Sequence, residues 1–146
     1  MDDVSVLTLN SEQGEKRGMD EKSDSRPTVL LVEDFEDNRF MMRRLLEMSG
    51  YHVVEAVNGK QAVEFAKTER PDIILMDLSL PQLDGLSATR QIRQQEGLGK
   101  VPIIAVSAHD SADFHAQALA AGCNEYVTKP IDFDQLVKLL DRLTGS

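Results

Sequence analysis

The run Ile73-Ile74-Leu75-Met76-Asp77 places four large apolar residues directly before a carboxylate. A continuous apolar run of this kind is typical of a strand that is buried on both faces of a parallel sheet. A carboxylate at the end of such a run is unusual, because burying an uncompensated charge is costly. We therefore interpret Asp77 as a candidate functional residue at the carboxyl end of a central strand.

On either side of this run the chain alternates between strand and helix patterns. Apolar and β-branched runs predict strands over residues 28–33, 51–56, 72–77, 101–107 and 123–129. Capping residues and stop signals predict helices over residues 37–49, 58–70, from 84 onward, 111–121 and from 132 onward. This alternation predicts an α/β fold, a doubly wound, five-stranded parallel sheet with helices on both faces.

Polar residues end three of the other predicted strands. Glu33 ends the first strand and Asp34 follows it, Ser107 ends the fourth, and Lys129 ends the last. In open parallel sheets the ligand site lies beyond the carboxyl ends of the strands. We therefore expect these four residues to share one pocket with Asp77.

Three carboxylates in one pocket would repel one another unless a cation lay between them. Ligands that are all oxygen atoms favour a hard ion, Mg²⁺ or Mn²⁺, over Zn²⁺. This makes Glu33, Asp34 and Asp77 candidate metal ligands. Structural alternatives stay open: the first two acids could serve a helix N-terminus, and Lys129 and Ser107 could be ordinary surface and strand-end residues.

Composition restricts the class of protein. The 146 residues carry a net charge of -9, which disfavours nucleic acid and anionic membrane surfaces as partners. No apolar run approaches the roughly 20 residues that span a bilayer, and the acidic start is unlike a secretory signal. The single cysteine, Cys123, excludes an intrachain disulfide. These features are compatible with a cytoplasmic protein.

The chain divides into two parts of different composition. Residues 1–26 are polar and acidic overall, apart from a short apolar patch at 4–9, and are predicted to form a disordered arm. Residues 27–146 contain the alternating pattern and are predicted to form one domain.

Residues 28–143 resemble the receiver domain of the two-component response-regulator family. The resemblance rests on motifs that occur in family order and at family-like spacing: Glu33-Asp34, Asn58-Gly59 with Ala62, Asp77-Leu78-Ser79-Leu80-Pro81-Gln82-Leu83-Asp84-Gly85, Ser107-Ala108 and Lys129-Pro130. It implies the sheet order 2-1-3-4-5, with strands numbered along the chain, as in flavodoxin and the chemotaxis receiver.

The resemblance also implies a metal-dependent phosphoacceptor site. Asp77 would be the nucleophile that takes a phosphoryl group from a phosphohistidine. Asp34 and Asp77 would bind Mg²⁺ directly, with the backbone carbonyl of Ser79 as a third ligand. Glu33 would act mostly through water. Lys129 would pair with a phosphoryl oxygen.

Two further residues would form a switch by the same resemblance. Ser107 would turn to hydrogen-bond the phosphoryl group, and Tyr126 lies where the family places an aromatic residue that changes rotamer. The surface around Tyr126, the helix over 111–121 and the final helix would be the output face.

The expected function is that of a single-domain response regulator. It would be a signalling phosphoprotein that catalyses only its own phosphorylation and slow dephosphorylation, not a general enzyme. Its partners would be a histidine kinase or histidine phosphotransfer protein and a downstream protein, with the chain a monomer or weak dimer. Because the chain stops at Ser146, we expect no output domain after the receiver. The alternative is a relay module that passes the phosphoryl group on.

The first predicted helix is apolar over more than one core stripe, with Phe40, Met41, Met42, Leu45, Leu46 and Met48. Part of this surface is expected to contact a kinase or phosphotransfer helix.

Two other activities are known for this kind of fold, and in each case the sequence of one loop argues against the activity. A flavin-binding module needs a phosphate-accepting loop after the first strand, and residues 33–38 are too acidic for that. A phosphatase with an Asp nucleophile usually has a second acid two residues later, where this chain has Ser79. An interaction domain that is never phosphorylated would not need the complete acidic set.

Overall fold

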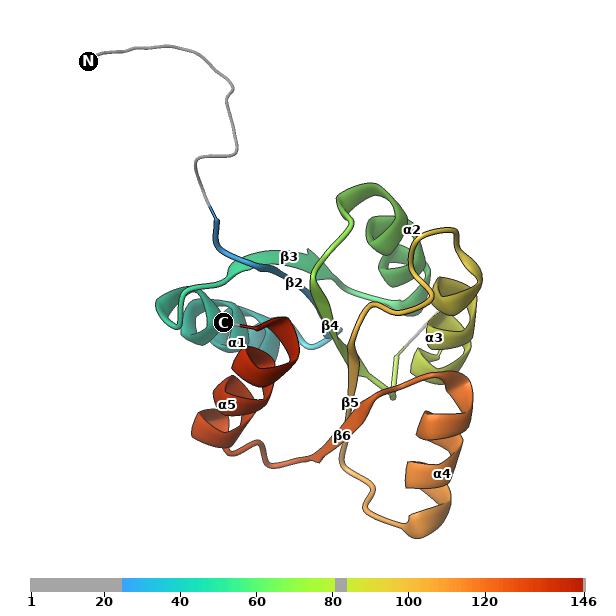
Figure 1. Ribbon diagram of the computed structural model, residues 1–146. Coiled ribbons are helices and arrows are strands. Elements are labelled where there is room, and N and C mark those ends of the chain that lie inside the picture. The colour runs from blue at the N-terminus through green and yellow to red at the C-terminus, as the bar shows by residue number, and fades with distance from the viewer. Residues whose placement is uncertain (1–24, 81–83, 146) are drawn as a thin grey trace, which may run out of the picture.

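The computed structural model describes residues 25–80 and 84–145, along which five strands and five helices alternate (Figure 1). In chain order they are β2 (Thr28–Val32), α1 (Glu36–Met48), β3 (His52–Ala56), α2 (Gly59–Glu69), β4 (Ile73–Asp77), α3 (Gly85–Gln94), β5 (Ile103–Ser107), α4 (Ala112–Ala121), β6 (Glu125–Thr128) and α5 (Phe133–Thr144). The predicted arm over residues 1–26 lies almost entirely outside the described residues, so the division into arm and domain stays a prediction.

The five strands are parallel and pair in the order β3-β2-β4-β5-β6. Numbered along the chain, this is the order 2-1-3-4-5, so the predicted fold class is confirmed. The run Ile73–Asp77 forms β4, in the middle of the sheet, and all five of its residues are buried. A strand covered on both faces needs a continuous run of apolar side chains, which Ile73–Met76 supply, and Asp77 is the single exception at its carboxyl end.

Helices cover both faces of the sheet (Figure 1). Helices α1 and α5 lie on one face, and α2, α3 and α4 lie on the other. Each face has its own core, with Leu46 and Leu140 among the buried residues of the first and Ala66 and Ile92 among those of the second. Because both faces of the sheet are covered by apolar side chains, a functional site built from polar groups is expected at the ends of the strands.

Side-chain caps fix where several helices begin. Asn58, Asp84, Ser111 and Asp132 each accept a hydrogen bond from the backbone N–H three residues later. At the other end of α4, Gly122 takes the left-handed conformation with φ of 118°. The predicted helix starts at Asn58 and Asp132 and the stop at Gly122 are therefore confirmed.

Leu98 is buried outside the third helix. The sequence pattern predicts a helix from residue 84 onward; α3 ends at Gln94, and Leu98 is buried in the turn that follows. The C-cap residue Gln95 has an extended backbone, which ends the helix. In the turn after it, the Leu98 N–H donates to the Gln95 carbonyl at 3.1 Å, and Gly97 has a positive φ of 83°. A loop and not a helix thus brings about the burial of Leu98.

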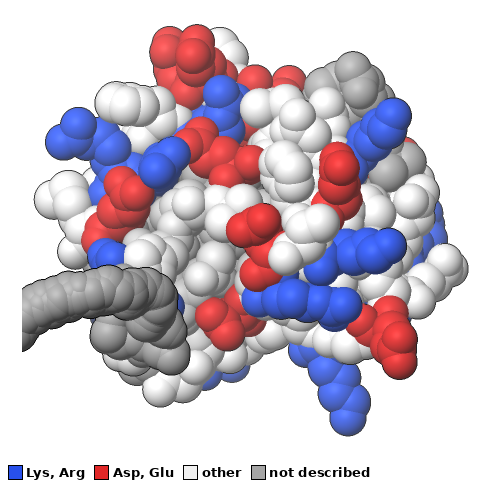
Figure 2. All heavy atoms as spheres, turned by 90° about the horizontal axis from the view of Figure 1, so that it is seen from above, with Lys and Arg blue, Asp and Glu red and all other residues white. Residues whose placement is uncertain are grey.

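The surface seen from above in Figure 2 carries acidic and basic side chains interspersed with one another. On this face the negative charge of the chain is therefore not gathered into one patch. Among residues 25–80 and 84–145, no helix combines the length and apolar character that crossing a bilayer requires.

Candidate metal centre

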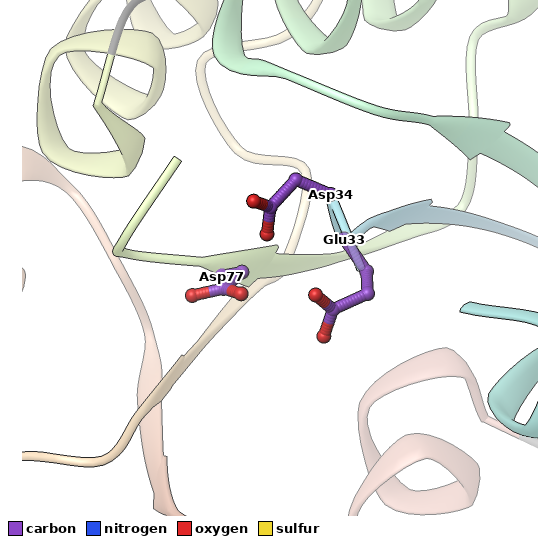
Figure 3. A group of neighbouring side chains, drawn as sticks. All are labelled: Glu33, Asp34 and Asp77. Carbon is purple, nitrogen blue, oxygen red and sulfur yellow. The ribbon is translucent and has the colours of Figure 1, made fainter. Parts of the chain in front are cut away.

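Three acids meet at the carboxyl ends of two neighbouring strands. Glu33 and Asp34 follow β2, and Asp77 is the last residue of β4. The parallel register pairs Val32 with Met76, so the residues that follow each of these leave the sheet side by side. One carboxylate oxygen from each acid lies within 4.8 Å of those of the other two. Figure 3 shows the three carboxyl groups pointing toward a common space.

The local electrostatics of this cluster favour a cation. Glu33 and Asp77 are only 7% and 5% exposed, whereas Asp34 is exposed. Burial raises the pKa of Glu33 above its ordinary value, and the nearby Asp77 carboxylate adds to the increase. The Phe35 N–H and the Lys129 ammonium act in the opposite direction. The ionised form of Glu33 would therefore be favoured by additional positive charge beside it, and a donor set made only of oxygen atoms fits Mg²⁺ or Mn²⁺.

Lys129 is the nearest described ammonium to the cluster. It follows β6, and its Nζ lies 3.4 Å from Asp77 Oδ2 and 3.9 Å from Glu33 Oε1. Its backbone N–H donates to the Ser107 carbonyl at 2.8 Å, and its peptide bond to Pro130 is cis. The other oxygen of Asp77, Oδ1, accepts from the Ser79 N–H at 2.9 Å. Asp77 is thus held from both sides, with Lys129 next to one of its two oxygens.

Ser107 and Tyr126 are linked through the backbone of His109. Ser107 is buried at the end of β5, and its Oγ accepts from the His109 N–H at 3.0 Å. Tyr126 is half-buried on β6, and its hydroxyl donates to the His109 carbonyl at 2.7 Å. The Tyr126 ring also stacks on His115, with centroids 3.9 Å apart. The backbone N–H and carbonyl of one residue, His109, in the loop between β5 and α4 therefore contact the two residues that the resemblance implies as a switch.

The structure brings together all the residues that the sequence placed at this rim, and their chemical roles stay predictions. Residues 81–83 of the Asp77 motif lie outside the described residues.

Sequence reasoning missed Arg39, Asp110 and His115. Arg39 contacts the backbone of the acidic pair, and Asp110 accepts from Thr128 and pairs with His115 at 3.0 Å. Their spacing in the sequence does not distinguish them from ordinary surface residues.

Gly85 packs directly against the main chain of the Asp77 strand. A Cβ atom at this position would lie 2.4 Å from the Asp77 carbonyl oxygen and 2.7 Å from Leu78 Cα, both of which are backbone atoms. We expect Gly85→Ala to destabilise the domain by about 1–3 kcal/mol, because overpacking here moves the end of β4. Gly99→Ala is the matched control, since its nearest contact would be a comfortable 3.9 Å. Urea unfolding of both variants tests this, and equal stability of the two would contradict it.

Comparison with known proteins agrees with this geometry. The response regulator receiver domain model matches residues 29–141. The polar-differentiation response regulator DivK of Brucella anthropi is 35% identical over 118 residues, which cover 81% of this chain and 96% of that protein.

Solved structures share the fold. The receiver domain of the Pseudomonas aeruginosa sensor histidine kinase PA1611, which has a magnesium ion coordinated in its active-site cleft, is 43% identical with a TM-score of 0.78. The alignment covers 84% of this chain and all (100%) of that one. The Vibrio cholerae chemotaxis protein CheY4 is 28% identical with a TM-score of 0.78, over 82% of this chain and 99% of that one. From its motifs, its sheet order and these matches, the chain belongs to the response regulator receiver domain family.

Proposed function

We propose that this chain is a Mg²⁺-dependent phosphoacceptor, in which Asp77 takes a phosphoryl group from a phosphohistidine of a histidine kinase or phosphotransfer protein. The observation that carries the proposal is the environment of Asp77. Its carboxylate is buried in a three-acid cluster, with Lys129 Nζ 3.4 Å from one oxygen. A cluster of this composition can hold a hard cation beside a nucleophilic carboxylate.

The reaction needs positioning and charge neutralisation more than proton transfer, because phosphoryl transfer has a loose transition state. An Asp77 oxygen would form the new P–O bond while the P–N bond of the donor breaks, and the imidazole nitrogen keeps that electron pair. Lys129 would pair with a phosphoryl oxygen. Bound Mg²⁺, held by Asp34, Asp77 and the Ser79 carbonyl with Glu33 acting through water, would neutralise further charge.

We also propose that phosphorylation is sensed through the loop between β5 and α4. The aspartyl phosphate would bring nearly two negative charges into the site. If Ser107 moves toward it, the hydrogen bond from the His109 N–H changes, and the carbonyl of the same residue accepts from the Tyr126 hydroxyl. Tyr126 borders α4, where Leu119 is 63% exposed, so this motion would alter an apolar surface available to a downstream protein.

The surface of α1 supports a helical donor partner. Of the apolar residues in the first helix, Met42 and Leu46 are core residues, whereas Phe40, Met41 and Met48 are exposed. A groove of about 420 Å³ borders Met41 and reaches Glu33 and Lys129 of the acidic site; its lining residues are Glu33, Asn38, Met41, Met42, Leu45, Lys129, Pro130, Ile131 and Phe133. A helix carrying a phosphohistidine could lie in this groove with its imidazole facing Asp77.

A relay module is the second candidate. The 43% identity to the receiver of a sensor histidine kinase favours it, since that receiver is part of a kinase. A relay would return the phosphoryl group to a phosphotransfer protein, whereas a single-domain regulator would hold it while bound to its target. In either role we propose a cytoplasmic location and a monomer or weak dimer.

The test is the response to a phosphoryl mimic. In ¹⁵N NMR spectra with Mg²⁺ and beryllofluoride, we expect the amide signals of Ser107, His109, Tyr126 and Lys129 to shift. Beryllofluoride without Mg²⁺ is the control and should leave them in place. Spectra that do not change in either condition would rule out the proposed function.

A further inference from the structure

The Arg39 guanidinium contacts the main chain of the acidic pair. Arg39 lies in the first turns of α1, and its side chain is 15% exposed. Its Nη1 donates to the Glu33 carbonyl at 3.1 Å and lies 3.4 Å from the Asp34 carbonyl. The contact therefore reaches the backbone that carries both acids, at the point where the chain leaves β2 and turns into α1.

Glu55 orients this guanidinium from the neighbouring strand. Arg39 Nε donates to Glu55 Oε1 at 2.9 Å, and Glu55 belongs to β3, which pairs with β2. The other Glu55 oxygen accepts from Arg43, one turn further along α1. The two arginines share one carboxylate, but Arg39 is the one that also donates to the acidic loop.

The loop has a second tie to β3. The Glu33 N–H donates to the Ala56 carbonyl at 3.0 Å, which fixes the start of the loop at the end of the sheet. Asp34, the next residue, is exposed and lies outside the strand. Arg39 supplies a fixed point there, because its planar donors can bond a carboxylate and carbonyl oxygens at the same time.

We propose that Arg39, oriented by Glu55, is a positioning residue for the metal centre. It holds the main chain of Glu33 and Asp34 so that both carboxylates meet Asp77. This inference rests on the divalent cation site of the proposed function. Groups that orient metal ligands without touching the ion commonly change metal affinity by 10–100-fold when they are replaced.

A structural role for the same side chain makes a different prediction. If Arg39 only ties α1 to β3 through Glu55, its loss should resemble the loss of Arg43, which has the same partner. If it positions the loop, its loss should weaken Mg²⁺ binding where the loss of Arg43 does not. The two arginines thus provide a matched pair within one helix.

The experiment compares Arg39→Ala, Arg39→Lys and Arg43→Ala with the wild-type protein. Mg²⁺ affinity is measured by calorimetry and Mn²⁺ affinity by electron paramagnetic resonance, without phosphorylation. We expect Arg39→Ala to weaken binding about 10-fold and Arg39→Lys to have an intermediate effect, because lysine keeps the ion pair but lacks the planar set of donors. Arg43→Ala should change the affinity less than about twofold, as expected of an exposed ion pair.

Two metal-free measurements complete the test. Chemical denaturation reports the stability of each variant, and ¹⁵N NMR reports the Glu33 and Asp34 amides, which should shift in the Arg39 variants. Wild-type Mg²⁺ affinity in folded Arg39→Ala or Arg39→Lys protein would overturn the positioning role alone. If Arg39→Ala does not fold, Arg39→Lys decides the question. A wild-type protein that binds neither ion would overturn the proposed function and this inference together.

Discussion

Asp77→Asn protein should gain no phosphoryl group from acetyl phosphate and Mg²⁺, under conditions in which the wild-type protein gains the mass of one. The reason is chemical, since a neutral amide is a far weaker nucleophile than a carboxylate. Intact-protein mass spectrometry measures the gain directly. We expect phosphorylation to be lost completely, because Asp77 is the one residue proposed to accept the phosphoryl group.

The variant is expected to stay folded. Asparagine keeps a side-chain oxygen that can accept from the Ser79 N–H, and it removes a charge that repels Glu33. Asp84→Asn is the matched control: it makes the same chemical change next to the same strand, and asparagine caps a helix as well as aspartate does. That variant should be phosphorylated like the wild type. Phosphorylation of Asp77→Asn at the wild-type rate would place the acceptor elsewhere.

The fold and the rim residues were predictable because they depend on local pattern and on topology. The apolar run before Asp77 requires a strand buried on both faces, and alternation with helices makes that strand parallel to its neighbours. Parallel strands bring their carboxyl ends to one side of the sheet. Residues far apart in the chain, such as Glu33 and Lys129, can therefore be assigned to one site from the sequence pattern alone.

The contacts that support the site were not predictable in the same way. Arg39 and His115 lie in helices, where charged and polar residues usually face solvent, and nothing in their spacing distinguishes them from such residues. Their contacts depend on how a helix packs against a loop or a strand, which periodicity does not report. The same limit applies to α1, where the sequence showed an excess of apolar residues but not that Met42 is buried and Met41 exposed.

Asp34→Ala should weaken Mg²⁺ binding by more than about 100-fold, beyond the range for residues that only orient a ligand. The change removes a charged oxygen from a cluster in which all three acids lie within 4.8 Å. The remaining acids cannot compensate easily, since Glu33 is buried with a raised pKa and Asp77 is already shared with Lys129. Calorimetric titration with Mg²⁺ measures the effect, and phosphorylation by acetyl phosphate should slow in parallel.

Asp37→Ala separates direct ligation from general attraction. Asp37 is an exposed acid in the first turn of α1, so its loss changes the net charge equally but leaves the cluster of Glu33, Asp34 and Asp77 intact. An exposed charge outside the cluster is largely screened by salt, and this variant should bind Mg²⁺ within about threefold of the wild type. Equal losses in the two variants would mean that the ion responds to the overall acidity of the loop. A large loss confined to Asp34→Ala would instead assign the cation to the space that the three carboxylates face.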